Sequence, residues 1–205
     1  LTEHVFHNLP GIKTARLPKG GLMVTVPGEK DDAPRGLTAH ADTLGAMVKT
    51  IKPNGRLQLT RIGGVVWNTV ETEGCTVYTR AGKPIRGAIL VTTASIHVFG
   101  DKLAETPRKD ENMEVRLDER VFSAEDVRSL GISVGDFVSF DPRVEPTNGF
   151  VRSRHLDDKA CVACLVEAVR ALTSAGVKPA QTCYIYINNY EEVGLFSAAD
   201  FPSPI

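Results

Sequence analysis

Two groups of residues have the types and spacing for metal or acid–base chemistry. One residue separates His40 from Asp42, so both side chains project to the same side of an extended chain. There an imidazole can bind a metal through one ring nitrogen while a carboxylate orients the ring through the other. Asp157 and Asp158 precede an apolar segment, and adjacent carboxylates repel each other unless a cation or hydrogen-bond donors hold them.

A third group, Glu191 and Glu192, follows residues 182–190, whose β-branched and aromatic residues are typical of a buried strand. In a regular strand the two carboxylates would face opposite ways. They can converge on one site only if the chain turns, and Gly194 favours such a turn. Two adjacent carboxylates can then have different roles, one binding a metal and the other transferring a proton.

Each group alone has a structural interpretation: a polar loop around His40, a helix cap at Asp157 and Asp158, and a solvated strand end at Glu191 and Glu192. Together they favour a site, because all three lie at the carboxyl end of a strand or the start of a helix. Functional groups gather at that edge of open α/β sheets. One imidazole with several carboxylates suits a pair of divalent ions such as zinc, cobalt or manganese.

The elements that must position these groups belong to an α/β domain. Residues 22–26 and the apolar residues before His40 are expected to be strands, and residues 157–173 to be a helix that Gly176 ends. With the strand at 182–190, this order predicts a βαβ-type unit with parallel strands.

The middle of the chain has short apolar runs separated by glycine and proline, which is typical of a β-rich module. Ser123 is expected to cap a short helix at residues 124–130. The sequence therefore predicts a catalytic α/β domain in two pieces, residues 1–51 and 149–205, interrupted by a β-rich domain at residues 52–148. The expected strands of this insertion include residues 63–66, 75–79, 88–92, 95–99, 114–117 and 137–140.

Composition excludes several classes of function. The 24 basic and 25 acidic residues are balanced and dispersed, which argues against nucleic acid as a partner. Apolar runs fall short of the roughly 20 residues that span a bilayer, and no leader segment opens the chain, so a cytoplasmic protein with no membrane partner is expected. The four cysteines are too sparse for a disulfide framework, and Cys161 and Cys164 are expected to be buried structural thiols.

The groups occur in an order that resembles the tetrahedral aminopeptidase family, which includes glutamyl aminopeptidases and proteins often labelled endoglucanase M. Residues 40–45 (H-A-D-T-L-G) resemble its H-x-D-x-x-G element. Residues 156–159 (L-D-D-K) are similar to its D-[ND]-[KR] element, and residues 191–194 match its E-E-V-G element. Residues 131–138 resemble the end of its inserted β domain.

The resemblance implies a mixed sheet flanked by helices, as in zinc peptidases, and two divalent metal ions per complete subunit. His40 would bind one metal, with Asp42 orienting the imidazole, and Asp157 would bridge both metals. Glu192 would bind the second metal, and Glu191 would be the general base that activates water. The substrates would be short peptides that lose their N-terminal residue.

The resemblance also implies that residues 52–148 are a dimerisation domain, through which such proteins build dimers and then dodecamers. The family has a further Asp and a further His ligand downstream of E-E-V-G. This chain begins at Leu1 and ends at Ile205, eleven residues after Gly194, so a fragment is expected. The alternative is a gene product that ends here with a partial metal site.

Two other functions remain open at this point. A non-catalytic assembly or peptide-binding protein could retain the fold and the dimerisation module, and counting metal ligands would discriminate it from an enzyme. Paired carboxylates also occur in glycoside hydrolases, which need carboxyl groups about 5–9.5 Å apart across a sugar. The His-x-Asp group has no natural role in that chemistry.

Overall fold

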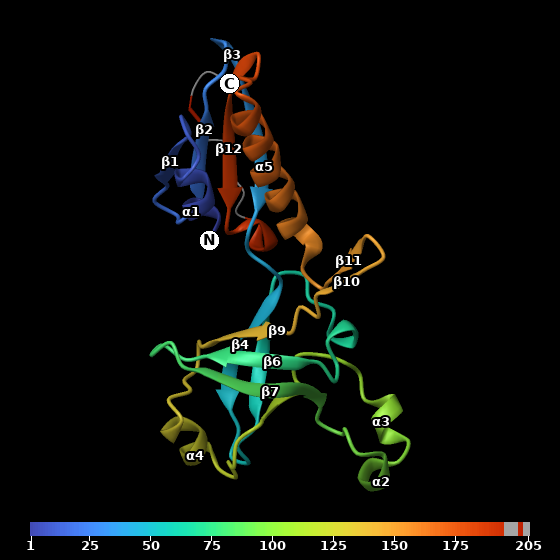
Figure 1. The fold of residues 1–205 in the computed structure, drawn as a ribbon. Helices are drawn as coiled ribbons and strands as arrows, with labels where there is room; N and C mark the ends of the chain where they lie inside the picture. The colour runs from blue at the N-terminus through green and yellow to red at the C-terminus, as the bar shows by residue number, and fades with distance from the viewer. Residues whose placement is uncertain (195–200, 203–205) are drawn as a thin grey trace. The chain divides into compact units, whose positions relative to one another are not determined.

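The computed structural model describes residues 1–194 and 201–202. The chain divides into two compact units, one formed by residues Leu1–Thr43 with Pro146–Ile205 and the other by Leu44–Glu145 (Figure 1). The second unit is inserted between the two sequence pieces of the first. Among the described residues, no helix combines the length and the apolar character needed to cross a membrane.

The first unit is built on a four-stranded sheet with the strand order β1-β2-β12-β3. Strands β3 and β12 are parallel, whereas β2 is antiparallel to both of its neighbours. The sheet is therefore mixed, and the predicted fold class is confirmed. In chain order the elements are α1 (Thr2–His7), β1 (Lys13–Arg16), β2 (Leu22–Val26), β3 (Lys30–His40), α5 (Leu156–Ala175), β12 (Gln181–Asn188) and the 3-10 turn η2 (Glu191–Val193).

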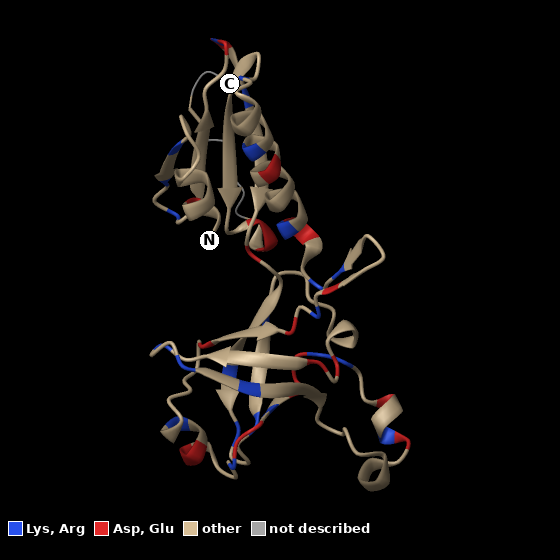
Figure 2. Cartoon of the chain, in the orientation of Figure 1, with Lys and Arg blue, Asp and Glu red and all other residues tan. Residues whose placement is uncertain are grey.

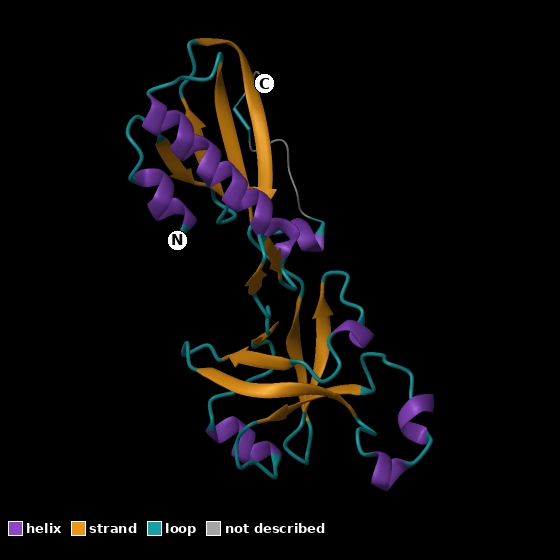
Figure 3. Ribbon diagram, turned by 45° about the vertical axis from the view of Figure 1, so that its right-hand side comes forward, coloured by secondary structure: helices purple, strands orange, loops and turns teal. Residues whose placement is uncertain are grey.

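Helix α5 crosses one face of this sheet (Figure 3). Three valines recur at helical spacing and give the helix an apolar side that packs on the sheet. Val162, Val166 and Val169 are buried in one cluster with apolar residues of β2, β3 and β12. The predicted helix at 157–173 is thus confirmed, and it ends at Gly176, whose φ of 65° is left-handed.

The valine stripe also explains why one expectation is wrong. Cys161 and Cys164 are exposed rather than buried. The three valines hold one face of α5 against the sheet, and the two cysteines lie outside that buried face. Cys75, in contrast, is fully buried in the second unit, and burial raises the pKa of its thiol to about 12.

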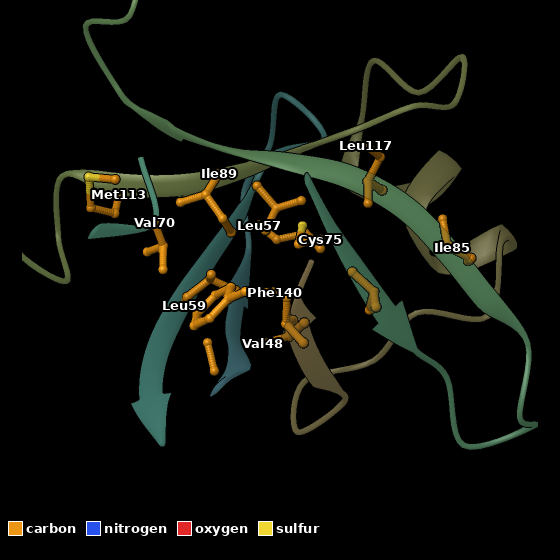
Figure 4. Close-up of a cluster of buried hydrophobic side chains, with 14 of the residues drawn as sticks. Val48, Leu57, Leu59, Val70, Cys75, Ile85, Ile89, Met113, Leu117 and Phe140 are labelled. Atoms are coloured by element: carbon orange, nitrogen blue, oxygen red, sulfur yellow. The ribbon is translucent and has the colours of Figure 1, made fainter. Parts of the chain in front are cut away.

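The second unit contains a closed barrel of six antiparallel strands in the order β4-β5-β8-β7-β6-β9. Leu57 and Leu59 of β5 and Phe140 of β9 point into its interior and are almost fully buried (Figure 4). The elements are β4 (Gly45–Ile51), β5 (Leu57–Ile62), η1 (Trp67–Thr69), β6 (Gly74–Tyr78), β7 (Pro84–Val91), α2 (Ile96–Phe99), α3 (Lys102–Glu105), β8 (Met113–Leu117), α4 (Ala124–Ser129) and β9 (Phe137–Phe140). The hairpin β10 (Glu145–Thr147) and β11 (Phe150–Arg152) follows.

Strand β4 belongs to this barrel, whereas residues up to 51 were predicted to belong to the first sequence piece of the α/β domain. Gly45–Ile51 pairs with β5 and with β9, so the division between the units falls after Thr43. The apolar pattern of a strand does not indicate which sheet the strand joins, because its partner strands are distant in the chain.

Two expected strands of the insertion are wrong, and one helix is confirmed. Residues 95–99 contain helix α2 instead of a strand, since a short apolar run does not distinguish the two structures. The expected strand 63–66 is absent because β5 ends at Ile62 and Gly63 takes a left-handed φ of 73°. Helix α4 begins as predicted, with Ser123 and Asp126 forming a reciprocal capping box.

Candidate functional site

The candidate site lies at the carboxyl end of the two parallel strands of the first unit. His40 is the last residue of β3 and is in register with Asn188, the last residue of β12. The segment after His40 and the turn η2 after Asn188 are therefore neighbours, although almost 150 residues separate them. Figure 2 shows acidic residues gathered at this end of the sheet, beside the start of α5.

The His40 side chain is only 8% exposed, and its imidazole has a partner at each ring nitrogen. Nδ1 lies 3.2 Å from the Asp42 carbonyl oxygen, which can only accept, so the proton on Nδ1 donates to it. Nε2 faces Asp157 Oδ1 at 3.0 Å and Glu191 Oε2 at 3.7 Å. Because those oxygens are also acceptors when ionised, a proton or a cation must lie between Nε2 and the carboxylates.

Opposing effects act on the charge of this imidazole. Burial is the largest single effect and disfavours the charged form, but the hydrogen bonds to the Asp42 carbonyl and the Asp157 carboxylate, together with the negative charges of Asp42 and Glu191, outweigh it. The net result is that the pKa of His40 is raised above its ordinary value. The cluster of carboxylates therefore favours a positive charge at this point.

Asp42 fixes the turn that carries the glutamate pair. Its Oδ1 accepts from the Glu191 amide at 3.3 Å, and its Oδ2 accepts from the Glu192 amide at 3.0 Å. The same carboxylate lies 3.4 Å from His40 Nδ1. Asp42 thus contacts the imidazole through both its carbonyl and its carboxylate, and it also holds η2 against the end of β3.

The start of α5 is joined to the same segment by two side chains. Asp158 Oδ2 accepts from the His40 amide at 3.2 Å, and Lys159 Nζ donates to the Ala41 carbonyl at 2.7 Å. Burial lowers the pKa of Lys159, although the Asp42 carboxylate opposes this effect. A hydrogen bond to Asp158 raises the pKa of the Cys161 thiol, which disfavours the thiolate and so argues against cysteine chemistry here.

The donor set fits one side of a metal centre. An imidazole nitrogen and a carboxylate oxygen converge with space beside them, because the Asp157 side chain is 86% exposed. These are the ligand types that zinc, cobalt and manganese take in proteins. Within the ranges 1–194 and 201–202, however, no group of three or more His, Cys, Asp or Glu side chains is arranged to hold a metal ion.

The structure brings four of the five predicted site residues into one side-chain cluster: His40, Asp42, Asp157 and Glu191. Glu192 joins them through its backbone amide, which Asp42 binds. Lys159 had no predicted role, although it lies in the L-D-D-K motif of residues 156–159. Asn188, a buried polar residue at the strand end, was not predicted either. The pair of asparagines after an apolar run is the turn signal that could have indicated it.

The fold is similar to that of solved aminopeptidases. An aminopeptidase of the archaeon Desulfurococcus kamchatkensis, APDkam598, superposes with a TM-score of 0.81 at 26% identity, covering 97% of this chain and 52% of that one. The TET1 peptidase of Pyrococcus horikoshii, described as assembling into a tetrahedron or a large octahedral shell, gives a TM-score of 0.75 at 25% identity over 94% of this chain and 55% of its own.

The chain belongs to the M42 glutamyl aminopeptidase family, whose model matches residues 20–205. It is 47% identical to the putative aminopeptidase YhfE of Bacillus subtilis, over 93% of this chain and 55% of that protein. It is 30% identical to a glutamyl aminopeptidase of Lactococcus lactis, over 87% of this chain and 50% of that protein. The chain thus spans about half the length of these curated relatives.

Proposed function

We propose that the full-length protein is a metal-dependent aminopeptidase that removes N-terminal residues from short peptides. The observation that carries the proposal is the convergence of His40, Asp157 and Glu191 at the carboxyl end of parallel strands. Membership of a peptidase family supports it. Family membership gives no support to the glycoside hydrolase alternative, because the relatives are described as aminopeptidases.

The proposed centre holds two divalent ions, zinc, cobalt or manganese. His40 would bind one ion, Asp157 would bridge both, and Glu192 would bind the second, with an Asp and a His from beyond the E-E-V-G element completing the set. When bound, such ions polarise the peptide carbonyl and lower the pKa of water. The 3.0 Å approach of His40 Nε2 to Asp157 Oδ1 supports this assignment, because two acceptors at that distance need a cation or a proton between them.

Glu191 is the proposed general base. Its carboxylate would take a proton from the attacking water and pass that proton to the amine that leaves as the peptide C–N bond breaks. The position of Glu191 supports this role, because its Oε2 reaches the His40 imidazole while its side chain remains about half exposed to solvent. Asp42 would keep the base in place through its hydrogen bond to the Glu191 amide.

The activity is tested with a matched pair of peptides that differ only at the N-terminus. We expect the full-length, metal-supplemented protein to release the first residue of a short peptide with a free α-amine, and to leave its N-acetylated counterpart intact. Carboxylates gathered at the site favour an ammonium group on the substrate. Chromatography with mass detection of the released amino acid makes the measurement.

Two outcomes would contradict the proposal. Internal cleavage of both peptides would identify an endopeptidase. Tight peptide binding without any release, with metals supplied, would favour the non-catalytic peptide-binding alternative.

We further propose that the unit Leu44–Glu145 is a subunit-contact domain and that the protein is a cytoplasmic homo-oligomer, between a dimer and a dodecamer. Tyr78 and Phe137 are paired across β6 and β9, and both are about half exposed. Aromatic residues are enriched in subunit interfaces. The assembly described for the Pyrococcus horikoshii relative supports the proposal.

Light scattering on the full-length protein at micromolar concentration is expected to give at least twice the subunit mass. The double variant Tyr78→Ser with Phe137→Ser should reduce that mass, because it removes the exposed aromatic surface. The control Val98→Ser changes an exposed apolar residue of α2 elsewhere on the unit. A strictly monomeric wild-type protein would contradict the proposed role of this unit.

A further inference from the structure

The turn that carries the glutamate pair is organised by Asn188, a residue whose side chain is not in the cluster of His40 and the carboxylates. Asn188 ends β12 and is 1% exposed. Its side-chain Oδ1 accepts from the Asn189 amide at 2.7 Å and from the Tyr190 amide at 3.1 Å. An Asn side chain that binds the amides after it replaces the strand's own hydrogen bonds and reverses the chain.

The hydrogen bonds of Asn188 continue directly into those of Asp42. The amides of residues 189 and 190 bind Asn188, and the next two amides, of Glu191 and Glu192, bind the Asp42 carboxylate. Four consecutive backbone donors thus have side-chain acceptors, and only two side chains supply them. The backbone of Asn188 joins the same system, because its carbonyl accepts from the Ala41 amide at 2.8 Å.

The rest of the Asn188 amide group shows that packing alone does not account for this residue. Its Nδ2 is buried and has no hydrogen-bond partner among the described residues. A buried donor without a partner destabilises a fold, so this nitrogen does not explain why an asparagine stands at that place. The accepting oxygen is therefore the feature that gives an asparagine an advantage over a leucine here.

We infer that Asn188 is a positioning residue for the reaction, holding the turn that places the Glu191 carboxylate beside His40. The inference rests on the proposed function, since it assigns Asn188 a role through the general base. Because its side chain is buried, Asn188 does not contact substrate, and its effect reaches the reaction only through the geometry of the 189–192 segment. Loss of its oxygen should therefore change kcat and leave KM unchanged.

The test compares Asn188→Leu with Asn188→Ser in the full-length protein. Leucine keeps the volume and removes the acceptor, whereas the serine hydroxyl can still accept from the amides that follow it, more weakly. We expect kcat to fall about 10- to 100-fold in Asn188→Leu, the range typical of a small misplacement of a reacting group. We expect KM within about two-fold of wild type, unchanged metal content, and an intermediate kcat for Asn188→Ser.

Asn68→Leu, an exposed position in the other unit, is the control for the substitution itself. Wild-type kcat in a folded Asn188→Leu would overturn the inference, and so would a rise in KM without a fall in kcat. If Asn188→Leu does not fold, Asn188→Ser decides: an intermediate kcat at unchanged KM supports positioning, and wild-type kcat contradicts it. An inactive wild-type protein with its metals supplied would instead contradict the proposed function.

Discussion

Glu191→Gln is expected to lower aminopeptidase turnover in the full-length protein by about 10²- to 10⁴-fold, the contribution typical of a general base. The amide of glutamine keeps the size of the side chain but has no basic oxygen to take a proton from water. The backbone contact of residue 191 with Asp42 does not depend on the side chain, so the turn should be unchanged. Metal content should therefore stay near that of the wild-type protein.

The matched control is Glu167→Gln, which makes the same chemical change on the solvent face of α5, where Glu167 pairs with Arg170. It should leave turnover unchanged. Glu191→Asp adds a graded test, because it keeps a carboxylate but shortens its reach, so turnover should lie between that of wild type and Glu191→Gln. Near-normal turnover in Glu191→Gln would remove Glu191 from the role of base.

Glu192→Gln is expected to lower both turnover and the occupancy of one metal. A neutral amide is a poorer ligand for a divalent ion than a carboxylate, so the second ion should be held more weakly. The fall in turnover should exceed the roughly 10- to 100-fold loss that follows removal of a group that only orients a ligand. Raising the metal concentration should restore part of the activity of this variant, and none of the activity of Glu191→Gln.

The control for this variant is again Glu167→Gln, with metal content as the readout. If Glu192→Gln retains its full metal content while Glu191→Gln loses metal, the two roles are exchanged. If both variants lose metal in equal amounts, the assignment of Glu191 as general base and Glu192 as metal ligand is wrong.

The local elements could be predicted from sequence because their signals are short-range. The spacing of Val162, Val166 and Val169 marks the buried side of α5, and Gly176 ends it. Gly194 predicts the turn after β12, which the structure contains as η2. The order of the three acidic or histidine-containing groups was sufficient to recognise the family.

The contacts that join those elements could not be predicted, because they depend on which strands become neighbours. Asp42 binds amides almost 150 residues away, and nothing near it in sequence indicates this. The roles of Asn188 and Lys159 have the same origin, since each contacts the segment that follows β3. The pairing of β4 with the barrel is likewise set by distant partners.

Turnover and metal content, measured on the same samples of wild type, Glu191→Gln and Glu192→Gln, decide whether the two glutamates serve a dinuclear metal centre. We predict an active wild-type protein with two metal ions per subunit, as expected for a dinuclear hydrolase. We predict an inactive Glu191→Gln with the same metal content, and a Glu192→Gln that has lost both activity and metal. Full turnover in a wild-type protein stripped of metal by a chelator would contradict a metal-dependent reaction.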